Sequence, residues 1–127
     1  MNNKKYASID IGLKRIGLAT CLAMNIVTPA SAILRKNRNQ AASDVDAFLN
    51  HWEIDILVVG LPSASDEMQR RIAHFVKLLK FKGEIKYQEE NMSSIEATDL
   101  MKGQIKYKRD GRVDSLAAKI ILERYLL

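Results

Sequence analysis

The fold follows from one stretch near the start of the chain, residues 6–19, which reads YASIDIGLKRIGLA. Two short apolar runs typical of β-strands flank a basic turn, and Gly12 and Gly17 mark its ends. Glycine permits backbone angles that a Cβ atom would forbid and lets an anion come close. The stretch therefore predicts a β-hairpin with one carboxylate, Asp10, at the end of its first strand. A metal ligand facing a phosphate and an aspartate bonded to its own turn both fit this position.

The remaining pattern predicts an α/β domain. Apolar residues recur at strand or helix spacing along the chain, and the run at 54–60 is apolar almost throughout, as in a strand covered on both faces. We expect strands at 5–10, 15–21, 30–34, 54–60 and 84–90, and helices at 39–51, 68–79, 93–102 and 112–126. The resulting order is β-β-β-α-β-α-β-α, in which the last α stands for the two consecutive helices at 93–102 and 112–126. It gives a mixed five-stranded sheet with helices on both faces.

Length and composition limit the classes of protein that this chain can represent. Its 127 residues suit one domain, residues 1–127, and not the two domains that a sugar-kinase-like nucleotide cleft requires. Lysine and arginine number 20 against 15 acidic residues, which favours a polyanionic partner. No apolar run approaches the ~18 residues of a membrane span, no signal-peptide core follows Met1, and the single cysteine, Cys21, is expected in the core. We expect a cytoplasmic protein with no membrane contact, either a monomer or a homodimer.

Three acidic residues occupy positions where an active site could form. Asp10 and Glu90 end two expected strands, and ligands collect at the carboxyl ends of parallel strands. Glu89 points to the opposite face of its strand, and the residues alone leave open which of the two glutamates faces inward. Asp114 lies in the first turn of the last helix, on the same inward-facing side as Ala118. A carboxylate on that side needs a partner, and a metal ion would supply one. The alternative for Asp114 is a stabilising interaction with the helix dipole, worth ~0.3–1 kcal/mol.

The hairpin resembles the opening signature of the YqgF family, which comprises bacterial RNase H-like proteins described as Holliday-junction-resolvase-like or as pre-16S rRNA nucleases. Three further segments carry the resemblance: VVGLP at 58–62, QEENMSSIEA at 88–97 and RVDSLAA at 112–118. Together they span nearly the whole chain. The resemblance implies an RNase H-like fold, with Asp10, Glu90 and Asp114 as catalytic metal ligands for Mg²⁺ or Mn²⁺. It also favours Glu90 over Glu89.

The resemblance implies a nuclease that processes the 5′ end of pre-16S rRNA. Branched DNA, as in a Holliday-junction resolvase, is the alternative substrate. A ribosome-assembly factor that binds nucleic acid without cutting it is the alternative from another class. Asn91 stands where the family carries an arginine, Glu89 where it carries an aspartate, and residues 63–68 replace a glycine-rich continuation. These departures bear on substrate choice more than on the metal site.

Basic residues flank two of the candidate ligands. Those expected to contact nucleic acid are Lys14, Arg15, Lys106, Lys108, Arg109 and Arg112. Lysine and arginine give sequence-independent affinity for phosphates, although a solvated loop is the alternative for the group at 106–112. Arg70 and Arg71 are expected on the solvent-facing side of their helix.

Overall fold

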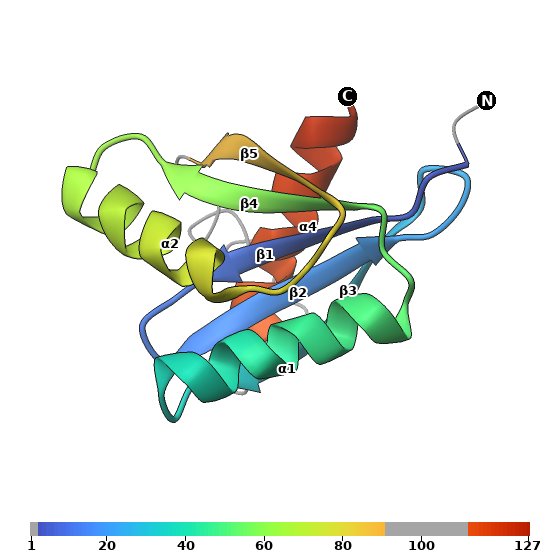
Figure 1. Cartoon of the computed structure of the whole chain (residues 1–127). Helices are drawn as coiled ribbons and strands as arrows, with labels where there is room; N and C mark the ends of the chain where they lie inside the picture. Colours follow the sequence, from blue (N-terminus) through green and yellow to red (C-terminus); the bar gives the residue numbers. More distant parts are fainter. Residues whose placement is uncertain (1–2, 91–111) are drawn as a thin grey trace.

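The computed structural model describes residues 3–90 and 112–127, with side chains described from residue 115 onward in the second range. Its centre is a five-stranded sheet in the order β3-β2-β1-β4-β5 (Figure 1). The strands are β1 (Tyr6–Ile11), β2 (Arg15–Cys21), β3 (Val27–Leu34), β4 (Ile56–Pro62) and β5 (Glu84–Glu90). The helices are α1 (Arg38–His51), α2 (Asp66–Leu78) and α4 (Arg112–Leu126).

The pairing of the strands decides which residues meet. β1 and β2 form the predicted hairpin, with Asp10 paired to Gly17, and β3 continues the antiparallel pairing beyond β2. β4 runs parallel to β1, and β5 runs parallel to β4. The carboxyl ends of β1, β4 and β5 therefore lie at one edge of the sheet, the edge where parallel strands present ligand sites.

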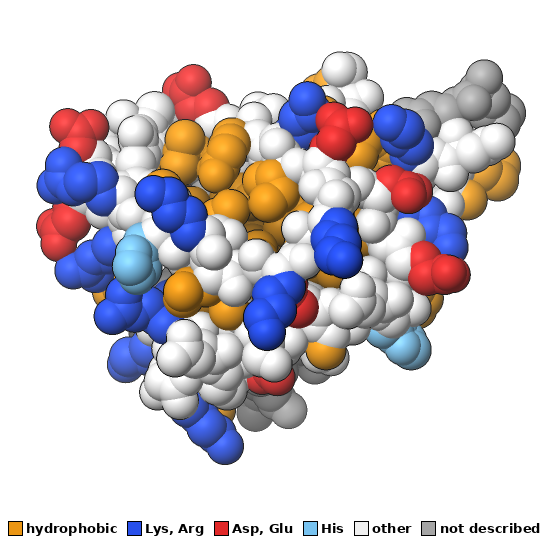
Figure 2. Space-filling model, viewed as in Figure 1, with side chains coloured by type: hydrophobic (Ala, Val, Ile, Leu, Met, Phe, Trp, Pro, Cys, Tyr) orange, Lys and Arg blue, Asp and Glu red, His pale blue; other side chains and the backbone are white. Residues whose placement is uncertain are grey.

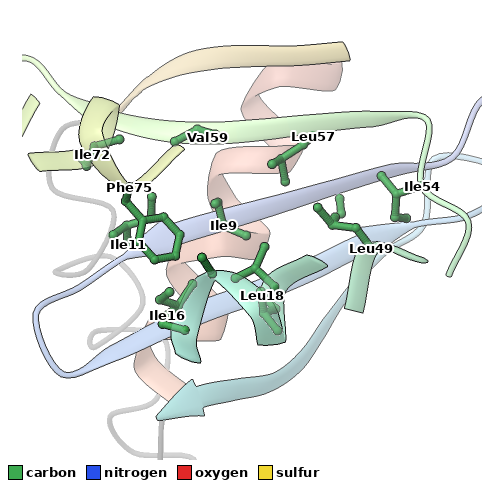
Figure 3. Packing of buried hydrophobic residues seen from close by; sticks show 14 residues of the cluster. Ile9, Ile11, Ile16, Leu18, Leu49, Ile54, Leu57, Val59, Ile72 and Phe75 are labelled. Carbon is green, nitrogen blue, oxygen red and sulfur yellow. The ribbon is translucent and has the colours of Figure 1, made fainter. Parts of the chain in front are cut away.

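Helices cover both faces of the sheet (Figure 1). α1 and α2 pack on one face, where Ile9, Leu57, Leu49 and Phe75 belong to one buried cluster (Figure 3). α4 packs on the other face, where Ile121 meets Val58 and their neighbours in a second cluster. Strand residues alternate between these two clusters, as β geometry requires. The side of the sheet that a residue faces thus follows from its place in the strand.

Local sequence signals determine where α1 and α2 begin. The Asn37 side chain accepts a hydrogen bond from the backbone of Gln40, and the Gln40 side chain accepts one from the backbone of Asn37, which completes a capping box before α1. Ser65 caps α2 by accepting from the backbone N–H of Met68. These caps satisfy N–H groups that would otherwise lack partners at the helix starts.

Two buried serines attach α4 to the sheet. The Ser8 hydroxyl donates to the carbonyl of Ala118 at 2.6 Å, which joins β1 to the helix. The Ser115 hydroxyl donates to the carbonyl of Ala30 at 2.6 Å, which joins β3 to the first half of the helix. Each bond links a buried polar group to a partner far away in sequence, so the pair fixes the position of α4 across the sheet.

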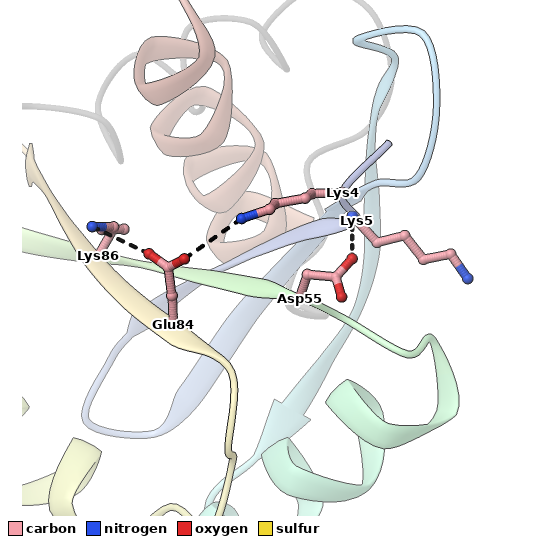
Figure 4. Close-up of polar contacts among 5 residues, drawn as sticks. All are labelled: Lys4, Lys5, Asp55, Glu84 and Lys86. Atoms are coloured by element: carbon pink, nitrogen blue, oxygen red, sulfur yellow. Dashed lines mark hydrogen bonds and ion pairs between the residues drawn. The ribbon is translucent and has the colours of Figure 1, made fainter. Parts of the chain in front are cut away.

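Charged residues at the opposite edge, where the parallel strands begin, pair with one another. The Asp55 carboxylate accepts from the backbone N–H of Lys5 at 2.8 Å, and Glu84 forms ion pairs with Lys4 and Lys86 (Figure 4). These contacts tie the starts of the parallel strands together, and they give Asp55 and Glu84 partners within the chain. In the described part of the chain, no helix combines the length and apolar character that a membrane crossing needs.

The predicted architecture is confirmed, with shifts at some boundaries. β3 begins at Val27 and not at residue 30, because an edge strand tolerates Pro29. β4 covers Ile56–Pro62 and not 54–60. Cys21 is buried, as expected. The helix predicted at 93–102 lies outside the described residues.

Candidate active site

Asp10 lies near the end of β1 on the face that α4 covers. Its strand neighbours Ile9 and Ile11 belong to the cluster under α1 and α2, whereas Ser8, two residues earlier, bonds to α4. Strand alternation places Asp10 on the side of Ser8. The hairpin turn begins directly after Ile11, so this half-buried carboxylate lies beside the turn that carries Lys14.

Glu90 ends β5 on the same face of the sheet as Asp10. It pairs with Pro62 of β4, and its predecessor Glu89 pairs with Leu61. Leu61 packs against the cluster under α1 and α2, so Glu89 points to that face and Glu90 to the α4 face. The structure therefore shows that Glu90, and not Glu89, points to the face of Asp10, a choice that the residues alone left open.

The side chains of Asp10 and Glu90 share a hydrogen bond. Burial raises the pKa of the Glu90 carboxyl, while the bond to Asp10 and the positive charge of Arg124 act in the opposite direction. Two carboxylates can share a hydrogen bond only when one of them carries a proton. Two acidic groups about 80 residues apart in sequence thus meet in a partly buried place where a positive charge is favourable.

Gly60 makes room for this pair. A Cβ atom on Gly60 would lie 2.9 Å from Oε2 of Glu90 and 2.5 Å from Cδ1 of Ile121. Both distances are shorter than ordinary contacts with carbon, so only glycine lets the Glu90 carboxylate and α4 approach β4 this closely. The site therefore draws on three strands and α4: β1 supplies Asp10, β5 supplies Glu90, β4 supplies the space, and α4 supplies the positive charge of Arg124.

The donor set fits a divalent metal ion in part. Carboxylate oxygens are the ligands that Mg²⁺ prefers, and a cation between Asp10 and Glu90 would offset the repulsion between the two ionised carboxylates. Within the described residues, no group of three or more potential ligands of this kind occurs. Asp114 lies in the first turn of α4, and its side chain is outside the described part of the chain.

The predicted nucleic-acid contacts are described only at the hairpin. Lys14 is exposed in the turn and Arg15 begins β2, half-buried. Lys106, Lys108 and Arg109 lie outside the described residues, and Arg112 is described only as the first residue of α4.

Sequence reasoning missed a basic cleft on the other face of the sheet. Arg70 and Arg71 are exposed, as expected, but they also line a cleft together with Arg35, Arg38 and the hairpin residue Gly12. The arginines of this cleft come from two segments more than 30 residues apart, so no local spacing could reveal it. The acidic pair and the cleft lie at the same end of β1, on opposite faces.

Comparisons with known proteins give a consistent family match. A family model described as "RuvX: Holliday junction resolvase" matches residues 4–127. A protein of Sulfurimonas denitrificans named "Putative pre-16S rRNA nuclease" is 58% identical over 125 residues, which cover 96% of each chain. A protein of Sulfurovum sp. with the same name is 60% identical over 125 residues, covering 96% of this chain and 98% of the relative.

Two Holliday junction resolvases are among the solved structures with a similar architecture. Thermus thermophilus RuvC, in complex with a Holliday junction substrate, superposes with a TM-score of 0.59 at 11% identity and covers 96% of this chain and 92% of its own. The fowlpox virus Holliday junction resolvase gives a TM-score of 0.58 at 16% identity, covering 95% and 99%. At such identities the likeness establishes the RNase H-like fold alone.

Proposed function

The chain belongs to the RuvX family, described as Holliday junction resolvases, and from this membership we propose that it is a divalent-metal-dependent nuclease acting on precursor 16S rRNA. Its family and the names of its curated relatives make it a nuclease, a hydrolase of phosphodiester bonds. The YqgF resemblance of the hairpin and the later motifs is confirmed by the same comparisons. The metal requirement, the ligands and the substrate form the proposal.

The meeting of Asp10 and Glu90 is the observation that carries this proposal. The two side chains come from different strands, lie on one face of the sheet and share a hydrogen bond at the carboxyl edge. A structural pair at this place would gain more from an arginine or lysine than from a second acid, because burial disfavours ionised carboxyl groups. The free-energy cost of burying two acidic side chains together is typical of a functional site.

We propose that Asp10 and Glu90 hold Mg²⁺ or Mn²⁺ and that Asp114 supplies a third carboxylate. When bound, the metal would provide a Lewis acid and an activated water for phosphodiester hydrolysis. Asp114 opens α4 one residue before Ser115, whose buried hydroxyl fixes this end of the helix to β3. The chain thus holds the candidate ligands on regular elements and not on loops, which favours a defined geometry.

Charged groups around the pair have roles that the chain itself suggests. The positive charge of Arg124 on α4 favours the ionised form of Glu90, so it helps keep this carboxylate ready for a cation. Lys14 at the hairpin turn is placed to contact a phosphate beside Asp10. Lys106, Lys108, Arg109 and Arg112 complete the proposed phosphate contacts, at positions whose side chains the structure does not describe.

Precursor rRNA is the proposed substrate because the curated relatives carry that name over nearly their full length. The description of the family favours a second candidate, a four-way DNA junction. Both substrates present phosphodiester backbones, and the acidic pair does not distinguish ribose from deoxyribose. As part of the proposal we place the protein in the cytoplasm, where bacterial rRNA matures.

A cleavage assay with matched variants tests the proposal. Labelled precursor rRNA fragments and four-way junctions are incubated with Mg²⁺, with Mn²⁺ or with EDTA. We expect metal-dependent cutting that is lost in Asp10→Asn and Glu90→Gln and kept in Glu89→Gln. The control removes a carboxylate next to Glu90 that points to the other face of the sheet. Intact substrates with wild-type protein under all conditions, or equal loss in all three variants, would overturn the proposed mechanism.

A further inference from the structure

A cleft of about 470 Å³ opens on the face of the sheet opposite the acidic pair. The hairpin turn, the segment from β3 to α1 and one side of α2 form its walls. Its volume lies in the range of sites that bind small ligands or parts of larger ones. In Figure 2, Lys and Arg side chains gather where α2 lies, at the left of the molecule. The cleft therefore combines room for a ligand with positive charge.

The charges that line the cleft are unbalanced. Four arginines, Arg35, Arg38, Arg70 and Arg71, stand against one carboxylate, Glu67. Glu67 forms an ion pair with Arg71 at 2.8 Å along α2, so the negative charge of Glu67 is already paired on the same helix. Arg38 and Arg70 have no ion pair to any carboxylate of the described residues. The cleft thus presents guanidinium groups whose natural partner is an anion from outside the chain.

Arg35 differs from the other three because the fold holds it in place. Its guanidinium donates to the carbonyl of Gly12 at 2.7 Å and lies 5.4 Å from the centre of the Phe75 ring. Burial, and next the nearby charge of Arg38, lower the pKa of Arg35. The two positive charges repel each other, and a bound anion near both would relieve that repulsion. Arg35 therefore contributes a fixed positive charge and links the hairpin to Phe75 of α2.

Apolar side chains form the remaining surface of the cleft. Ile11 and Ile72 belong to the buried cluster, Met68 is half-buried, and Leu13 at the turn is 66% exposed. An apolar floor below a rim of arginines suits a ligand that has both a flat apolar part and phosphates. A nucleotide within a strand has these properties, whereas an acidic peptide would leave the floor without a matching group.

We propose that this cleft binds one or two nucleotides of a single-stranded segment of nucleic acid, with Arg38 and Arg70 on phosphates and the apolar floor against a base. The proposal rests on the proposed function, because it extends the path of the substrate from the acidic pair. Asp10 and Ile11 are adjacent in β1. The side chain of Asp10 belongs to the acidic pair, and that of Ile11 lines the cleft on the other face. A strand that passes the end of β1 could therefore reach both faces around the hairpin.

Binding measurements in a cleavage-deficient background test this inference. Fluorescence anisotropy of a 5′-labelled ten-nucleotide uridine RNA is recorded from 50 to 300 mM KCl with the Asp10→Asn protein. Adding Arg38→Gln and Arg70→Gln should weaken binding about 10-fold near 150 mM salt and reduce the slope of log K against log salt by about 1.4, as expected for two lost phosphate contacts on a single strand. Circular dichroism establishes that the variants fold.

A matched charge control uses Lys77→Gln with Lys82→Gln, which removes two exposed positive charges outside the cleft. This variant should keep the full salt slope. If both double variants lose affinity equally, general electrostatics explains binding and the inference is wrong. Competition with uridine monophosphate separates a strand site from a mononucleotide site. Displacement of the RNA by micromolar nucleotide would also overturn the inference.

The two proposals can fail separately. If the wild type cuts RNA and Arg38→Gln with Arg70→Gln leaves the salt slope unchanged, the cleft inference falls and the nuclease stands. If no substrate is cut but the double variant loses affinity and slope, the cleft inference stands without the proposed mechanism. A photoreactive 4-thiouridine in the RNA should crosslink to Leu13 or Met68. Crosslinks confined to α4 would contradict the binding site.

Discussion

The carboxylate of Glu90 lies directly against the backbone of Gly60, since a Cβ atom on this glycine would lie 2.9 Å from Oε2 of Glu90. The same Cβ atom would lie 2.5 Å from Cδ1 of Ile121 on α4. One missing methyl group in β4 thus allows two elements to approach: the end of β5 with its acid, and the helix that covers the face. Packing and the candidate site therefore depend on the same position.

Gly60→Ala should damage both stability and activity. The added methyl group must displace the Ile121 side chain and the Glu90 carboxylate, and overpacking of this kind costs about 1–3 kcal/mol. Urea denaturation measures the change in the free energy of unfolding, and cleavage of precursor rRNA measures activity. A variant with wild-type stability and activity would contradict the described approach of Glu90 to β4.

A double variant separates the two effects. Ile121→Val removes Cδ1 and should relieve the contact with the helix, so its cost should not add to that of Gly60→Ala. We expect the double variant to be more stable than the sum of the single changes predicts. Its activity should stay low, because the Cβ atom still displaces the Glu90 carboxylate. Recovery of activity together with stability would assign the damage to the helix alone.

Glu90→Gln should stabilise the metal-free protein while it abolishes cleavage. Burial raises the pKa of Glu90, so the folded state loses stability as pH rises through that pKa and the group ionises. Glutamine carries no charge and its amide can donate to Asp10. We expect a gain of ~0.5–2 kcal/mol near neutral pH, the range that single stabilising substitutions commonly give.

The stability advantage of Glu90→Gln over the wild type should increase with pH. Below the ordinary pKa of glutamic acid, Glu90 is protonated in both states, and the advantage of Glu90→Gln should be small and constant. Above it, the advantage should grow until Glu90 is ionised in the folded state. Denaturation in EDTA between pH 4 and pH 8 measures the difference, with Glu89→Gln as the control. An advantage that shrinks with rising pH would contradict the described burial of Glu90.

A divalent cation should stabilise the wild type through the acidic pair. A ligand that binds only the folded state at 100 times its Kd adds about 2.7 kcal/mol. Thermal unfolding with Mg²⁺ should show this gain, and Asp10→Asn should lose most of it. Potassium chloride at the same ionic strength controls for screening. An equal gain in wild type and Asp10→Asn would place the cation elsewhere.

The hairpin and the central strand could be predicted from sequence because their signals are local. The apolar run of β4 indicates a strand buried on both faces. Gly12 marks the turn of the hairpin, whereas Gly17, predicted at its other end, lies inside β2. The choice between Glu89 and Glu90 could not be derived from the residues alone, because it depends on the register of β5 against β4. Only the resemblance favoured Glu90 in advance. The arginine cleft depends on the placement of α2 beside the hairpin, which spacing along the chain does not encode.

Ser115→Ala should reduce cleavage more than Ser8→Ala, although both remove a buried hydroxyl that bonds α4 to the sheet. Ser8 makes one such bond, whereas Ser115 donates to Ala30 and also accepts from the backbone N–H of Leu18 at 3.5 Å. Ser115 directly follows Asp114, so loss of its bond to Ala30 loosens the turn that carries the proposed third ligand. Leaving the Ala30 carbonyl without this donor should cost about 1–3 kcal/mol. The carbonyl of Ala118 lies within the helix and keeps a helical partner, so Ser8→Ala should cost about 0.5–1.5 kcal/mol. Cleavage rates below the unfolding temperature of each variant give the comparison, and equal rates for the two variants would argue against a role for the first turn of α4 in the site.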